Sequence, residues 1–229
     1  MTLPASVPYW QVVLGSFFAI IFVKCLCGGL GQNIFNPALA ARALLMVVFP
    51  MGLTRYVGVD GVSAATPLHH MVMPALPEES VLDMFLGNCP GSIGEISALA
   101  LLLGGAYLVY RKVISLRIPV AYLGTVALLT LVFGKTDNHF SWMLYSLFSG
   151  GLMLGAIFMA TDYATSPATP VGQVIYGVGC GVLTVIFRYF GLFPEGVTYA
   201  ILLMNAVVWF IDRHTAMRRF GTGKRGAAK

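Results

Sequence analysis

The sequence predicts an all-α protein that crosses a membrane several times, and three observations lead to this fold class. Of the 229 residues, 58% are hydrophobic and only 10% are charged, whereas a soluble domain carries about 25% charged residues. Apolar runs of membrane length recur along the chain, and basic residues gather after Ile211. So few charges cannot cover a water-facing surface. This excludes an ordinary soluble enzyme, a disordered tail and a nucleic-acid-binding protein, and it indicates a lipid bilayer as the main solvent.

Seven apolar runs are long enough to be membrane spans. Glycines recur in the sixth run, where small residues let neighbouring helices approach closely. We expect Gly177, Gly179 and Gly181 to pack against other helices, because they lack the preceding strand that a nucleotide-binding fingerprint requires. The predicted spans are 9–27, 36–53, 93–110, 118–134, 143–160, 171–190 and 197–211.

The basic residues predict the orientation, because cytoplasmic loops of membrane proteins are rich in Lys and Arg. The tail 213–229 and the loop 111–117 are therefore expected on the cytoplasmic side of a bacterial inner membrane. The segment 54–92 and Met1 are then expected outside. The net charge of +5 thus indicates a membrane anchor and no nucleic-acid partner.

The predicted orientation also bears on the domain organisation. An external N-terminus without a signal peptide predicts an odd number of helices before Met1. Residues 37–45 and 194–202 are similar, and each opens a helix after a glycine-rich turn, which favours an inverted repeat. We expect about seven helices from a ten-helix architecture that resembles urea transporters. Its parts are 1–53, the last two helices of the first repeat; 54–92, an extracytoplasmic loop; 93–212, a five-helix second repeat; and 213–229, a basic cytoplasmic tail.

The extracytoplasmic loop carries the sequence DGVSAATP at residues 60–67. It resembles a flavinylation motif, Asp-x-x-Ser/Thr-Gly-Ala-Thr, whose last Thr bears FMN through a phosphoester. Ala64 stands where that motif has Gly. Attachment needs an accessible hydroxyl among small residues and a flavin transferase outside the cytoplasm; the alternative is a simple polar turn before Pro67. The positions that match the motif are Asp60, Ser63, Ala65 and Thr66.

Four further motifs follow one another along the chain: GGLGQNIFNPALAARA at 28–43, GNCPGSIGE at 87–95, MATD at 159–162 and PEG at 194–196. Together with the loop motif they make the chain resemble the RnfD and NqrB membrane subunits of the Rnf and Nqr redox-driven ion pumps. The resemblance covers nearly the whole chain. Around Thr66 and in the run 199–205 it is closer to RnfD.

The resemblance implies two flavins. FMN would be attached covalently to Thr66, and a non-covalent riboflavin would bind near Asn33 and Asn36 at the cytoplasmic face. Asn amides can pair with the carbonyl and N–H edge of an isoalloxazine ring, but the same side chains can cap the helix that Pro37 opens. Asp162 lies on the same side and either joins that site or caps a turn.

Charged residues near the outer face are candidates for an ion pathway, because ionisable groups in membrane segments are costly and often functional. They are Glu95, Arg188 and Glu195. A carboxylate there can ligate Na⁺ or carry H⁺; the alternative is binding to amides at a helix N-terminus. We expect no catalytic residue and no metal site, since the four cysteines lack the CxxC pairs typical of metal ligands.

The sequence therefore predicts an electron-transfer subunit of an Rnf-type ferredoxin:NAD oxidoreductase, a translocase without turnover of its own. The expected partners are a second covalent-FMN subunit, iron–sulfur subunits, the flavin transferase, the lipid bilayer and either Na⁺ or H⁺. Two alternatives remain open at this point. One is the NqrB subunit of an Nqr-type NADH:quinone reductase, and the other is a non-redox channel that shares the urea-transporter architecture.

Overall fold

The computed structural model describes residues 2–26, 31–53, 56–57, 63–64, 80–191 and 196–216, and this part of the chain is almost entirely helical. A two-residue antiparallel ladder joins β1 (Tyr56–Val57) to β2 (Ser63–Ala64). The helices are α1 (Tyr9–Phe17) with the π-helix η1 (Phe18–Leu26), α2 (Pro37–Val48), α3 (Pro50–Leu53), α5 (Val81–Leu86), α6 (Ala98–Tyr110), α7 (Arg117–Val132), α8 (His139–Phe148), α9 (Leu152–Leu154) with the π-helix η2 (Gly155–Met159), α10 (Pro170–Phe190) and α11 (Gly196–Thr215).

The described helices confirm an all-α, multi-pass membrane protein. Within the described residues, three helices are long and apolar enough to cross a membrane: Tyr9–Leu26, Pro170–Phe190 and Gly196–Thr215. A fourth candidate is the pair His139–Phe148 and Leu152–Met159, which bends by 64° at its break. The shorter apolar helices α2, α6 and α7 occupy the remaining predicted runs.

Two helix boundaries differ from the expected ones. The third run begins its helix at Ala98 and not at residue 93, because the Ser97 hydroxyl caps it by accepting from the Ala100 amide. The fifth run is broken between α8 and α9, where Ser149 is extended and Gly150 adopts a φ of 64°. Glycine adopts that left-handed conformation without the steric cost that a side chain imposes, so the local sequence permits the break.

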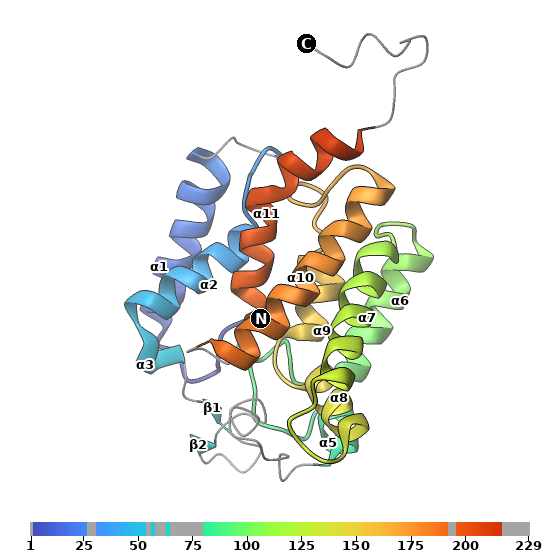
Figure 1. The fold of residues 1–229 in the computed structure, drawn as a ribbon. Helices are drawn as coiled ribbons and strands as arrows, with labels where there is room; N and C mark the ends of the chain where they lie inside the picture. Colours follow the sequence, from blue (N-terminus) through green and yellow to red (C-terminus); the bar gives the residue numbers. More distant parts are fainter. Residues whose placement is uncertain are drawn as a thin grey trace.

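The core of the bundle lies where α7, α10 and α11 pack together, with α2 against α11 on one side (Figure 1). Glycines allow the close approach, as predicted. A Cβ at Gly177 would lie 2.8 Å from the Ala121 Cβ on α7, and one at Gly179 would lie 2.5 Å from the Met204 Cε on α11. The glycines of α10 therefore serve helix packing on two different faces.

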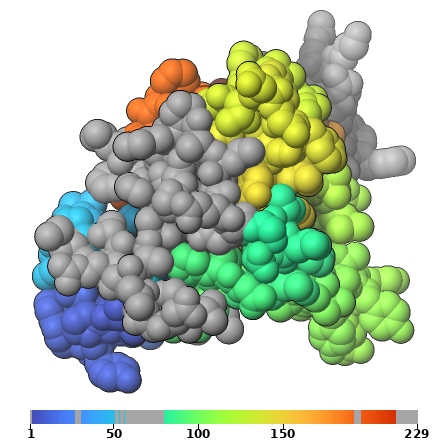
Figure 2. Space-filling model, turned by 90° about the horizontal axis from the view of Figure 1, so that it is seen from below, coloured from blue at the N-terminus to red at the C-terminus, as the bar shows by residue number. Residues whose placement is uncertain are grey.

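Different helices lie at the two ends of the bundle. The short helix α5 packs against α6 and α8 at one end, seen side by side with α8 from below in Figure 2. Helix α11 finishes at the opposite end, where the Asp212 carboxylate accepts from the Ala168 amide at 3.1 Å (Figure 1). The candidate site residues lie between these ends, along α2 and the helices that face it.

Candidate functional site

Asn36 is the first residue that fixes the site, because it organises the start of α2. Its Oδ1 accepts from the amides of Ala38 (3.0 Å) and Leu39 (3.4 Å), and Pro37 occupies the first helical position. Its Nδ2 donates to the Met159 carbonyl at 3.3 Å, across 123 residues of sequence. The cap expected as an alternative is thus present, and the same side chain also ties α2 to the end of η2.

Asn205 connects this cap to Asp162. The side-chain nitrogen of Asn205 faces the neighbouring acceptors. In this orientation its Oδ1 accepts from the Asn36 backbone N–H (3.2 Å), and its Nδ2 donates to the Thr165 carbonyl (3.3 Å). The Thr165 hydroxyl donates to the Asp162 carboxylate at 3.3 Å, so Asp162 also closes a local turn. We call Asn36, Asp162, Thr165 and Asn205 the amide cluster. It brings together the first and third motifs of the sequence with the middle of α11.

Asn33 lies just before the amide cluster and is itself buried, with 6% of its surface exposed. Its Nδ2 donates to the Phe35 carbonyl at 3.1 Å. This bond uses one of the two N–H groups of the amide. The structure thus links Asn36 to Asp162 through Asn205 and Thr165, whereas the hydrogen bond of Asn33 is local. A flavin site shared by these residues stays a prediction.

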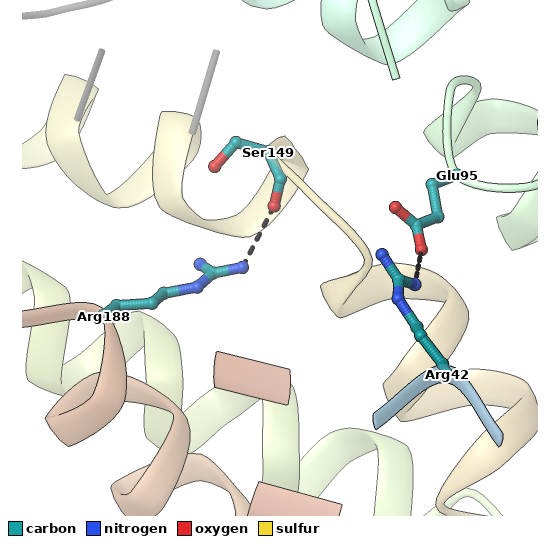
Figure 3. Close-up of polar contacts among 4 residues, drawn as sticks. All are labelled: Arg42, Glu95, Ser149 and Arg188. Atoms are coloured by element: carbon teal, nitrogen blue, oxygen red, sulfur yellow. Dashed lines mark hydrogen bonds and ion pairs between the residues drawn. The ribbon is translucent and has the colours of Figure 1, made fainter. Parts of the chain in front are cut away.

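A buried ion pair lies further along α2. The Arg42 Nη1 and the Glu95 Oε1 are 2.5 Å apart, and each side chain is only 5% exposed (Figure 3). Glu95 sits in the turn before α6, so the pair joins the first and second motifs across 53 residues. Buried charges are stable only when they are paired and hydrogen-bonded, which explains why these two side chains meet.

Arg188 approaches the same region from α10. Its guanidinium donates to the carbonyls of Ser146 (2.5 Å) and Ser149 (3.1 Å), and thereby holds the end of α8 at its break (Figure 3). A small cavity of about 10 Å³ lies beside Arg42, Glu95 and Arg188. That volume is about enough for one water molecule. We call these three residues the charge cluster.

The backbone around the charge cluster is shaped to fit the carboxylate. A Cβ at Gly151 would lie 2.7 Å from the Glu95 Oε1, so only glycine leaves room there. Met159 and Leu39 also line the cavity, and both contact the amide cluster through their backbone. The two clusters are therefore adjacent, separated along α2 by the six positions from Asn36 to Arg42, or about 9 Å of helix.

The remaining predicted site residues are those of the expected outer loop, together with Glu195. Ser63 lies in β2, opposite Val57. Asp60, Ala65, Thr66 and Glu195 lie outside the described residues.

Three residues of the two clusters were not singled out from the sequence: Arg42, Thr165 and Asn205. Thr165 lies just beyond the motif at 159–162. Arg42 stood inside a quoted motif, and its signal was a lone basic residue in an apolar helix. Asn205 stood in the run 199–205, as a lone amide in the middle of α11. In both cases the helical periodicity alone does not reveal the partner, because Glu95 and Asn36 come from distant parts of the chain.

Comparison with known proteins places this arrangement in a family. The chain is 49% identical over 97% of its length to the D subunit of the Na⁺-translocating ferredoxin:NAD⁺ oxidoreductase complex of Acetobacterium woodii, of which it covers 70%. It is 46% identical over 97% of its length to the proton-translocating counterpart of Clostridium ljungdahlii, covering 72%. The D subunit of the ion-translocating oxidoreductase complex of Stutzerimonas stutzeri is 39% identical over 99% of the chain, which covers 74% of it. The NQR2, RnfD, RnfE family model matches residues 1–221, and the chain belongs to this family.

Proposed function

We propose that this chain is the D subunit of an Rnf-type complex in a bacterial inner membrane, and that it carries electrons between two flavins while the complex moves Na⁺ or H⁺. The relatives named as D subunits of ferredoxin:NAD⁺ oxidoreductases favour an Rnf-type over an Nqr-type complex. The observation that carries the proposal is the amide cluster, in which the motifs at 28–43 and 159–162 meet.

We propose the region of Asn33 and the amide cluster as the place of a riboflavin. The chemistry of the donor set fits an isoalloxazine edge, which presents both carbonyl acceptors and an N–H donor. The described hydrogen bonds of Asn33 engage one of its N–H groups, whereas those of Asn36 engage both its Oδ1, which caps α2, and its Nδ2, which donates to Met159. Asn33 would therefore contact the ring, and Asn36 would hold the backbone around it. A bound flavin supplies the electron-transfer chemistry.

We propose Thr66 as the attachment point of FMN in the outer loop. The Thr66 oxygen would bond the phosphorus of the flavin phosphate as its proton leaves, and the previous substituent on that phosphorus would depart, in a reaction that a flavin transferase performs. Asp60, Ser63 and Ala65 would form the sequence that the transferase recognises. The small residues around the hydroxyl support this proposal, because they leave space for the phosphate.

The charge cluster is the proposed element for ion coupling. The Glu95 carboxylate is held between α2 and α10 beside a cavity that fits one water. A cation that enters would compete with Arg42 for the same oxygen, so binding and release would depend on where the Arg42 guanidinium lies. Arg188 would keep the α8–α9 break in place, and Glu195 would be a second candidate near the outer face.

In-gel flavin fluorescence tests the proposal. The chain, co-expressed with a flavin transferase, is denatured and separated by electrophoresis, so that only covalently bound flavin remains. We expect a fluorescent band that is lost in Thr66→Val, because valine has the shape of threonine without its hydroxyl. Thr66→Ser keeps a hydroxyl and should retain part of the signal.

A matched control separates attachment from folding. Thr136 lies in another loop, where its hydroxyl donates to the Asn138 carbonyl at 3.4 Å, so Thr136→Val should keep the full fluorescence. Absence of fluorescence in the unaltered chain, or its persistence in Thr66→Val, would contradict the covalent FMN at this residue.

A further inference from the structure

An apolar groove runs between α6 and α7 on the side of the bundle away from α1 and α2 (Figure 1). Its volume is about 760 Å³. It is lined by side chains of α6 and α7, with Leu147 and Ile157 as its floor. Small residues create the hollow. A Cβ at Gly124 would meet no atom within 4 Å, so the space above it is open.

A second, polar hollow lies beside the groove, at the end of the bundle where α11 finishes. This hollow has a volume of about 520 Å³. Val109 and Ile114 line both spaces, so the two are adjacent. The polar hollow is lined by hydroxyl and amide groups and one ammonium group, from Lys112, Ser115, Thr161, Ser166 and Gln173.

Lys112 is the residue that gives the polar hollow its charge, and its backbone is unusual. The Lys112 amide donates to the Val109 carbonyl (2.9 Å) and the Val113 amide to the Leu108 carbonyl (2.9 Å), which is the Schellman ending of α6. The left-handed position of that ending normally takes glycine, but here Lys112 has a φ of 56°. Side chains in this conformation are strained and are concentrated at functional sites.

Other residues complete an environment typical of a membrane surface. Arg111 and Arg117 flank Lys112 in the same loop, and the Arg117 guanidinium donates to the Gln173 side chain at 3.5 Å. Tyr110 lines the groove and Tyr163 the polar hollow, and both are more than four-fifths exposed. Exposed tyrosines gather at the level of lipid headgroups, which places the polar hollow at that depth.

We propose that the groove and the polar hollow together bind one anionic phospholipid. An acyl chain lies in the groove between α6 and α7, and the phosphate lies in the polar hollow beside Lys112. Charge complementarity favours this occupant over a transmembrane helix of a partner subunit, because a helix would fill the apolar groove but leave the basic, hydroxyl-lined hollow without a matching group. No residue of the amide or charge clusters lines the groove or the polar hollow, although Thr161, Tyr163 and Ser166 of the hollow are chain neighbours of Asp162 and Thr165.

Native mass spectrometry of the full chain in detergent tests the proposal. The probes are phosphatidylglycerol and phosphatidylcholine with identical acyl chains. We expect the unaltered protein to retain phosphatidylglycerol preferentially. Lys112→Gly should lower that retention about five-fold, the effect of one basic residue at a membrane surface, while its thermal unfolding midpoint stays equal or rises because the left-handed backbone suits glycine. Loss of retention without loss of stability excludes a purely structural effect.

The groove is tested with Gly124→Leu, whose side chain projects into the open space and should reduce retention of both lipids. Gly124→Ala is the matched control and should retain them, as should Lys24→Gln on η1. An unchanged preference for phosphatidylglycerol in Lys112→Gly would overturn the proposal. So would a Gly124→Leu protein that keeps its lipid but loses its partner subunits on purification of the complex, since that result assigns the groove to a helix.

Discussion

The amide cluster and the charge cluster meet at α2, which Asn36 caps and which contains Arg42, yet they bury their polar atoms in different ways. Asn36 satisfies its amide with neutral backbone groups of α2 and η2. Arg42 lies six positions further and meets a carboxylate from another part of the chain. A neutral amide that loses one partner leaves a modest penalty, whereas an ion that loses its partner leaves a large one. The charge cluster is therefore the more sensitive of the two regions.

The difference also separates the two proposed tasks. A group of neutral amides can hold a flavin edge without changing its own charge. A carboxylate paired with a guanidinium can exchange that cation for another, because Arg42 lies on α2 and Glu95 in the turn before α6, so the two groups are held by different segments. The first region is suited to positioning and the second to competition between charges.

The largest expected effect follows from removal of Arg42. Arg42→Leu leaves the Glu95 carboxylate buried without this guanidinium, and we expect a loss of about 3–5 kcal/mol in the free energy of unfolding. Replacement of both partners, as Arg42→Leu with Glu95→Leu, should restore most of the stability because no isolated charge remains. Unfolding of the three proteins in mixed detergent measures the difference.

Arg213→Leu provides the control for that experiment. Arg213 is exposed at the end of α11, with its guanidinium 5.5 Å from the Trp209 ring, so its loss should change the stability by less than about 1 kcal/mol. Equal losses in Arg42→Leu and in the double variant would contradict the ion pair as the source of the sensitivity.

The contrast between the clusters also shows how far sequence alone can reach. The helical runs and the cap at Asn36 depend on neighbours within one or two turns, so local patterns indicate them. The glycines of α10 indicate close packing, but the residues that they contact, Ala121 and Met204, come from other helices. The pairing of Arg42 with Glu95 depends on the turn before α6 arriving beside α2. No local pattern encodes that arrival. The open groove above Gly124 depends likewise on which helices fail to cover it.

The helix break at Gly150 depends both on the local sequence and on a contact with a distant segment. The glycines of the sequence SGG at 149–151 permit a break in the helix, but the apolar residues on both sides favour one continuous span. The structure resolves the conflict through Arg188, which binds the Ser146 and Ser149 carbonyls that a helix break leaves exposed. A side chain of α10, about 40 residues further along the chain, thus stabilises the break.

A smaller effect is expected in the amide cluster. Asn36→Ala removes the cap of α2 and should lower the free energy of unfolding by about 1 kcal/mol. Asn36→Asp keeps a capping oxygen and should recover most of that stability, but it lacks the N–H that reaches the Met159 carbonyl. If that bond positions the proposed flavin region, the non-covalent flavin content measured after extraction stays reduced in Asn36→Asp. A full flavin content in both variants would contradict this assignment.

The smallest effect concerns the N-cap of α5, which lies outside the membrane-spanning helices. There a neutral hydroxyl, that of Ser80, interacts with a charged carboxylate, that of Asp83. The Ser80 hydroxyl accepts from the Asp83 amide and donates to the Asp83 carboxylate at 2.6 Å. This hydrogen bond is the main cause that lowers the pKa of Asp83 below its ordinary value of 3.8. A carboxyl whose pKa is lower in the folded state contributes stability above its unfolded pKa and loses that contribution as the pH falls through the folded value.

Ser80→Ala should bring the pKa of Asp83 back toward 3.8 and flatten the dependence of stability on pH below about pH 4. NMR titration of Asp83 measures this shift, and an unchanged pKa in Ser80→Ala would assign it to a cause other than this hydroxyl.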